Sequence, residues 1–161
     1  MTAALVALGG NIEPRRAHLS GALSELASLP LTRLVAASAL RETAPVGCPP
    51  GSAPFLNAVA LLETQLSPRA LLDALLAVEA AHGRHRGAPN APRTLDLDLL
   101  LHGDAVLDEP GLVLPHPRMH RRDFVLRPAV EVAPELRHPL LRRTLRELLA
   151  SLPGSEATCT S

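Results

Sequence analysis

Two aspartates, Asp96 and Asp98, stand at alternate positions in a run that is otherwise leucine. In an extended strand alternate side chains point to the same face, so the two carboxylates would lie side by side, about 6.6 Å apart at their Cα atoms. Flanked by leucines, such a pair is unfavourable unless a cation lies close to it. Mg²⁺ takes carboxylate oxygens as ligands and brings substrate phosphates with it. The pattern therefore indicates either a magnesium site or two solvated aspartates on an edge strand. The same alternation predicts that four leucines share the opposite face: Leu95, Leu97, Leu99 and Leu101.

Basic and polar residues frame this aspartate pair along the chain. They are Arg84, Arg86 and Arg93 before it, His116 and Arg122 after it, and Glu79 in the last turn of an expected helix. Acids that hold a metal, together with guanidinium groups that bind phosphate, are typical of polyphosphate chemistry. Arginines beside a strand are also commonly solvated or in weak surface ion pairs, and a histidine between two prolines can be structural. The chain has no lysine and no P-loop motif, which excludes a P-loop nucleotide enzyme.

Composition limits the class of protein. The 161 residues are 47% hydrophobic and 20% charged, which predicts one globular domain over residues 1–153 and a flexible tail over 154–161. Lys+Arg and Asp+Glu are both 16, so a formal net charge of zero argues against a general nucleic-acid or membrane-surface binder. The two cysteines, Cys48 and Cys159, have no metal-ligand spacing. With no expected signal peptide or transmembrane run, we expect a reduced, cytoplasmic protein.

The order of the expected elements predicts an α+β fold. Expected strands cover residues 3–8, 31–43, 55–64 and 92–101, and expected helices begin at Pro14 and Ser67 and end near Pro30 and Gly83. This order is the ferredoxin-like βαββαβ arrangement, an antiparallel sheet covered by helices on one face. A short partner strand at 105–107 and a last helix opened by Thr144 would add a C-terminal hairpin and helix. A proline-rich loop at 44–54 is long enough to be functional.

Several ordered motifs resemble one family. Residues 92–100 (PRTLDLDLL) closely resemble the signature of 6-hydroxymethyl-7,8-dihydropterin pyrophosphokinase, an enzyme of the folate pathway. The likeness extends over nearly the whole chain, through LGGN at 8–11, ETAPVG at 42–47, FLNA at 55–58, VE at 78–79 with GR at 83–84, LPH at 114–116 and RDF at 122–124. The chain is therefore identified as a member of that family.

The resemblance implies transfer of the pyrophosphoryl group of ATP to the hydroxymethyl oxygen of the pterin, leaving AMP. It implies that Asp96 and Asp98 hold two Mg²⁺ ions, and that Arg84 and Arg93 act with them in catalysis. ATP would also meet Glu79, Leu99, His116 and Arg122. The pterin would lie between Phe55 and Phe124, the only aromatic residues of the chain apart from its histidines, with its edge near Thr43, Ala44, Val46, Asn57 and Asp96. We expect a monomer whose partners are ATP and the pterin.

The sequence departs from the family pattern at two places, and its motifs are also compatible with two other functions. The family often has a tryptophan just before the Pro-Arg of the signature, where this chain has Asn90-Ala91, and an aromatic residue where Pro117 follows the histidine. Neither departure touches the aspartate pair. The same Asp-x-Asp strand could serve another Mg²⁺-dependent phosphotransferase or nucleotidyltransferase. A ferredoxin-like module that senses an anion through its arginines is the non-enzymatic alternative.

Overall fold

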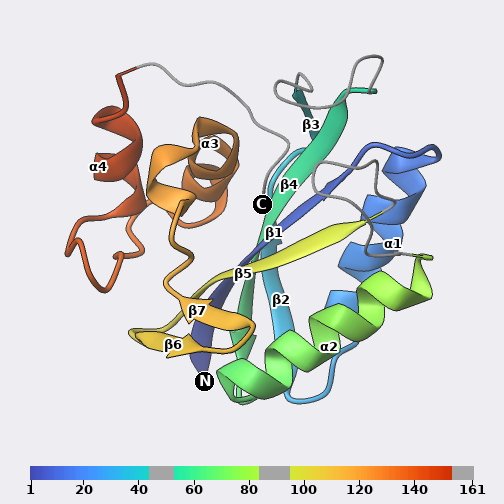
Figure 1. The fold of residues 1–161 in the computed structure, drawn as a ribbon, viewed down its shortest axis with the longest axis horizontal. Helices are drawn as coiled ribbons and strands as arrows, with labels where there is room; N and C mark the ends of the chain where they lie inside the picture. Colours follow the sequence, from blue (N-terminus) through green and yellow to red (C-terminus); the bar gives the residue numbers. More distant parts are fainter. Residues whose placement is uncertain (44–52, 84–94, 154–161) are drawn as a thin grey trace.

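The computed structural model describes residues 1–43, 53–83 and 95–153, and it is built on one antiparallel sheet. The main strands are β1 (Thr2–Gly10), β2 (Thr32–Ala37), β4 (Phe55–Thr64) and β5 (Asp96–His102), in the spatial order β2-β4-β1-β5 (Figure 1). A short strand, β3 (Arg41–Thr43), pairs with the start of β4. With α1 (Arg15–Ala27) and α2 (Pro68–Ala81) between the strands, the predicted α+β order is confirmed, and the single strand predicted over 31–43 is divided into β2 and β3.

Local signals set the bounds of α2. The Ser67 side chain accepts a hydrogen bond from the backbone N–H of Ala70, and Pro68 occupies the first turn, where its missing N–H is not needed. Leu71, Leu75 and Val78 recur at helical spacing, and all three are buried. After the helix Gly83 adopts a φ of +77°, the left-handed conformation that glycine tolerates best.

Helices cover both faces of the sheet. Figure 1 shows α1 and α2 on one side, and α3 (Asp123–Val132) and α4 (Leu145–Ala150) on the other. Two buried clusters match these layers, one around Leu19, Leu71 and Leu97 and the other around Val59, Leu100 and Leu126. The sequence predicted helices on one face of the core only, and α3 was not among the predicted elements. The expected C-terminal helix is present as α4, where Thr144 and Glu147 form a capping box.

A β-bulge changes which way β5 points its last side chains. The pairing of β1 with β5 shifts between Leu5 and Val6, whose partners are Leu101 and Leu99. Leu97 and Leu99 belong to the cluster under α1 and α2, whereas Leu100 and Leu101 both belong to the cluster under α3. The prediction that Leu101 faces the same side as Leu95, Leu97 and Leu99 is therefore wrong, because the bulge inserts one residue and reverses the alternation.

The connection after β5 also differs from the prediction. The turn is present, with Gly103 at a φ of +56°, but residues 105–107 do not form a strand beside β5. Instead β6 (Leu107–Glu109) pairs with β7 (Leu112–Leu114) as a separate hairpin. A 3-10 turn, η1 (Met119–Arg121), then leads into α3. Among the described residues no helix combines the length and the apolar character needed to cross a bilayer.

Candidate active site

The two aspartates of β5 lie opposite small residues of the neighbouring strand. Asp96 lies opposite Gly9 of β1, and Asp98 lies opposite Ala7, so the neighbouring strand offers almost no side-chain bulk. Gly9 is also opposite Asn57 of β4, and a Cβ on Gly9 would come within 2.9 Å of the Asn57 side-chain oxygen. Asp96, Gly9 and Asn57 thus form one row across three strands. The missing side chain of Gly9 leaves open the space between the carboxylate and the amide.

Asn57 is held in this row by a side-chain contact. Its Nδ2 donates a hydrogen bond to the hydroxyl oxygen of Thr43 on β3. Phe55 lies two residues earlier on β4 and therefore points to the same face as Asn57. Phe124 packs against the cluster under α3, which lies on that face. The structure thus brings Thr43, Phe55, Asn57, Asp96 and Phe124 to one side of the sheet, although Phe55 is only 6% exposed.

A buried arginine supplies positive charge near both aspartates. Arg122 is 7% exposed and follows η1, and its guanidinium carbon lies 5.6 Å from the centre of the Phe124 ring. Burial lowers the pKa of Arg122, the positive charge of Arg118 lowers it further, and Asp98 and Asp96 act in the opposite direction. An electrostatic interaction with both carboxylates places the guanidinium close to the pair. A phosphate group bound here would lie near the positive guanidinium of Arg122 and near the negative carboxylates of Asp96 and Asp98.

His116 is a neutral hydrogen-bond donor in this site. Burial, followed by the charges of Arg122 and Arg118, lowers the pKa of His116 to about 4 against a weaker opposing effect of Asp96. Its Nδ1 accepts a hydrogen bond from the backbone N–H of Arg118 at 3.2 Å. The neutral ring therefore carries its hydrogen on Nε2. Its own backbone N–H donates to the Leu100 carbonyl at 2.9 Å, which fixes His116 to the bulge of β5.

We predict that NMR will show His116 neutral from pH 8 down to about pH 5. Its imidazole signals should shift with a midpoint near pH 4, since that is the pKa that burial and the two arginines produce. The unfolded chain binds this proton near the ordinary pKa of about 6.5, so His116 contributes to a loss of stability as the pH falls from about 6.5 toward 4. Arg118→Gln should raise the midpoint. A wild-type midpoint near 6.5 would contradict the environment described here.

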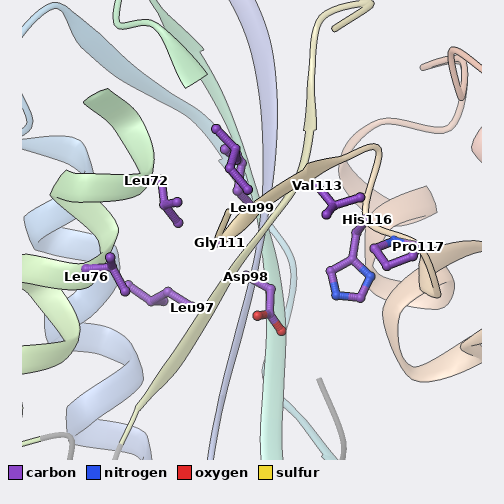
Figure 2. A pocket seen from close by; sticks show the side chains of 10 residues that line it. Leu72, Leu76, Leu97, Asp98, Leu99, Gly111, Val113, His116 and Pro117 are labelled. Atoms are coloured by element: carbon purple, nitrogen blue, oxygen red, sulfur yellow. The ribbon is translucent and has the colours of Figure 1, made fainter. Parts of the chain in front are cut away.

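A pocket of about 470 Å³ lies between α2, β5 and the β6–β7 hairpin. Its walls are largely apolar, and Asp98, His116 and Pro117 also line it (Figure 2). Leu99, expected at the ATP site, is one of the walls, together with Leu72, Leu76, Leu97, Leu112 and Val113. Figure 2 shows the Asp98 carboxylate and the His116 ring as the polar groups of this pocket. Its size and lining suit a flat heterocycle that carries charged groups at one end.

Glu79 of α2 contacts β5 between the two aspartates. It lies in the last turn of α2, is 2% exposed, and accepts a hydrogen bond from the backbone N–H of Leu97 at 2.7 Å. Leu97 is the residue between the two aspartates, so this carboxylate holds the strand at the point where both side chains emerge. The expected contact of Glu79 with ATP stays a prediction.

Four expected site residues lie outside the described residues: Ala44, Val46, Arg84 and Arg93. Two further residues, Asn11 and Arg15, hold the chain next to the site and were not predicted to do so. The Asn11 side chain donates to the Ala53 carbonyl at 3.1 Å, and Arg15 donates to the Pro54 carbonyl at 3.0 Å, which fixes the residues just before Phe55. The pocket walls on α2 and β7 were missed as well. Their only signal is an apolar residue at helical or strand spacing, which equally indicates a core position.

Comparisons with known proteins agree on one family. The sequence model described as 7,8-dihydro-6-hydroxymethylpterin-pyrophosphokinase (HPPK) matches residues 5–134. A protein of Pseudomonas aeruginosa named 2-amino-4-hydroxy-6-hydroxymethyldihydropteridine pyrophosphokinase is 49% identical over 148 residues, 92% of this chain and 90% of its own length. A protein of the same name from Methylorubrum extorquens is 42% identical, over 96% of each chain.

Solved structures show the same fold at much lower identity. A crystal structure of HPPK-DHPS in complex with substrates superposes with a TM-score of 0.70 at 13% identity and covers 93% of this chain. HPPK-DHPS of Plasmodium falciparum with pterin and p-hydrobenzoate superposes with a TM-score of 0.70 at 15% identity. The chain spans under half of these longer proteins, 43% and 44% of their lengths. At this level of identity, the two structures support only the fold of this chain.

Proposed function

The chain belongs to the 7,8-dihydro-6-hydroxymethylpterin-pyrophosphokinase family, and from this premise we propose how its site carries out the reaction. The enzyme is a pyrophosphokinase of folate biosynthesis: it transfers the pyrophosphoryl group of ATP to the hydroxymethyl group of 6-hydroxymethyl-7,8-dihydropterin and leaves AMP. The observation that carries the proposal is the alternate carboxylate pair of β5, which interacts with the buried Arg122 and of which Asp98 lines a largely apolar pocket.

We assign the nucleotide to the pocket between α2, β5 and the β6–β7 hairpin. Its leucine and valine walls suit the adenine ring, with Leu99 among them. The Nε2–H of His116 and the guanidinium of Arg122 are then donors for the phosphates or the ribose. Arg84 and Arg93 are proposed as further phosphate ligands. Glu79 acts as a positioning residue through Leu97, and its direct contact with ATP remains part of the proposal.

The pterin is assigned to the row that Asp96, Gly9 and Asn57 form across three strands. Asn57 and Thr43, together with Asp96, offer hydrogen-bonding groups along the row that Gly9 leaves open, and Ala44 and Val46 are proposed to continue this edge. Phe55 and Phe124 are proposed to contact the two faces of the ring. In this proposal the pterin and the nucleotide lie on either side of the carboxylate pair, so that the hydroxymethyl oxygen can approach the β-phosphorus.

Two Mg²⁺ ions are proposed to bind at Asp96 and Asp98. The fit is supported by two half-buried carboxylates on one strand face, since Mg²⁺ is commonly held by one or two carboxylates together with substrate phosphates and water. When bound, the ions neutralise phosphate charge and orient the triphosphate. The residues of the chain hold the two substrates in line. The bond from the hydroxymethyl oxygen to the β-phosphorus forms as the bond from that phosphorus to the α,β-bridging oxygen breaks, AMP is the leaving group, and the hydroxyl proton passes to solvent.

The reaction products test this function. Incubation with ATP, Mg²⁺ and the pterin should produce AMP and pterin diphosphate in equal amounts, measured by chromatography. ADP would instead indicate another phosphotransferase, and free pyrophosphate a nucleotidyltransferase. Nucleotide binding without Mg²⁺ and without turnover would indicate an anion-sensing module. The names of the relatives favour none of these alternatives. A monomeric, cytoplasmic enzyme is also proposed, and sedimentation equilibrium would test the first property.

A further inference from the structure

A cluster of two histidines and a glutamate joins α1 to the end of α2, outside the site described above. The Nδ1 atoms of His18 and His82 face each other at 3.1 Å, and the two rings meet edge to face. The Nε2 of His82 is 2.9 Å from a carboxylate oxygen of Glu25. His18 and Glu25 belong to α1, and His82 is the C-cap residue that directly follows α2. The two helices lie side by side on one face of the sheet (Figure 1).

The contacts restrict where the hydrogens lie. The Nε2 of His82 donates to Glu25, because a carboxylate can only accept, so the Nδ1 of His82 carries a lone pair when the ring is neutral. Two lone pairs facing each other at 3.1 Å would repel. A hydrogen on one of the two Nδ1 atoms, or a cation, must therefore lie between the rings. With neutral rings the hydrogen belongs to His18, which donates to His82; with a cation both Nδ1 atoms are ligands.

The glycine at position 21 shows that α1 makes room for the His82 ring. A Cβ on Gly21 would come within 2.9 Å of the Cε1 atom of His82. Glycine in the middle of a helix costs about 0.5–1 kcal/mol relative to alanine. Gly21 lies well inside α1, so the helix carries this cost at the position where the ring is seated. The His82 side chain is 13% exposed as a result, while the Glu25 side chain is 41% exposed.

We propose that His18 and His82 form a binding site for a divalent transition-metal ion of the Zn²⁺ class. Two imidazole nitrogens on one tetrahedral Zn²⁺, each at about 2.0–2.1 Å, lie about 3.3 Å apart, close to the separation found here. Glu25 supplies the carboxylate on the far ring nitrogen, the arrangement that orients metal-bound histidines. In the described residues no three acidic, histidine or cysteine side chains surround one point, so water completes the coordination.

Binding requires a small change in the cluster. The hydrogen of His18 moves from Nδ1 to Nε2, which leaves both Nδ1 lone pairs directed at the ion, and the rings turn slightly toward it. No net proton is released. The bound ion links α1 to the turn that ends α2, so it stabilises the folded chain. Imidazole ligands favour Zn²⁺, Ni²⁺ or Cu²⁺ over Mg²⁺, which separates this site from the carboxylate pair of β5.

Zn²⁺ titration by calorimetry tests the site in the full chain. We use the Asp96→Asn/Asp98→Asn protein as background, so that β5 contributes no binding. One equivalent should bind in the micromolar range and raise the melting temperature. His82→Gln and His18→Gln should abolish this binding, and Glu25→Gln should weaken it about tenfold. Gly21→Ala should also abolish binding, because the added methyl displaces the His82 ring. His120→Gln is the matched control and should leave it unchanged, since His120 belongs to a different ring pair, with His138.

Nitrogen NMR of the imidazoles provides a second readout that does not depend on stability. Zn²⁺ should convert His18 from the Nδ1–H to the Nε2–H form and shift both Nδ1 signals. The inference is overturned if Zn²⁺ leaves these signals unchanged, if binding is millimolar, or if it persists in His18→Gln and His82→Gln. Failure of pyrophosphoryl transfer would leave the metal site standing, and loss of the metal site would leave the proposed reaction standing.

Discussion

Replacing Asp98 by asparagine is expected to lower kcat by about a hundredfold or more while the fold survives. The amide keeps the shape of the side chain but is a poor ligand for Mg²⁺, and a metal contributes several kcal/mol of charge stabilisation in phosphoryl transfer. Asp96→Asn should have an effect of similar size, since both carboxylates emerge from the same face of β5. The measurement is the steady-state rate of AMP formation over a range of Mg²⁺ concentrations.

The matched control is an aspartate just past the other end of the same strand. Asp104 is exposed in the turn after β5, so Asp104→Asn should leave the rate unchanged. Thermal unfolding should show that both site variants remain folded, because removing one of two neighbouring like charges relieves repulsion. Near-normal rates in Asp96→Asn and Asp98→Asn would rule out a metal-binding role for the pair.

Elements with strong local signals were predicted from the sequence. Strand β4 follows its predicted range of 55–64, and α2 begins after the predicted Ser67 cap. Helix α3 was missed because its local signals point elsewhere. It begins after a basic segment and contains Pro128, which lacks a backbone N–H. It forms because Val125, Leu126 and Ala129 pack against the second face of the sheet, and that tertiary contact outweighs the local preference.

The carboxylate pair was accessible to sequence analysis because alternation in a strand is a local rule. Which groups surround the pair depends on strand register and chain path instead. Asp96 meets Gly9 and Asn57 only through the pairing of β5 with β1 and of β1 with β4. The bulge beside Leu100, which reversed the prediction for Leu101, is likewise a property of the pairing. Composition and spacing carry no information on these long-range registers.

The contact of Glu79 with Leu97 shows how such a long-range feature supports the site. A buried glutamate in the last turn of a helix is unfavourable for the helix dipole, because the C-terminal end already carries partial negative charge. Its oxygen instead satisfies a backbone N–H of β5 between the two aspartates. Glu79 therefore holds the peptide group from whose two sides Asp96 and Asp98 emerge.

Glu79→Ala is therefore expected to lower the free energy of unfolding by about 2–3 kcal/mol, because it leaves a buried N–H without this acceptor. Urea unfolding measures this loss. The same variant should lower kcat, since β5 is less firmly held, whereas Glu79→Gln keeps an acceptor oxygen and should retain most of the stability.

The Michaelis constant for ATP separates a positioning role of Glu79 from direct contact with ATP. If Glu79 binds ATP itself, Glu79→Gln raises that constant at nearly full stability; if it acts through Leu97, the constant stays close to that of the wild type. Equal, near-wild-type stability of the two variants would contradict the positioning role.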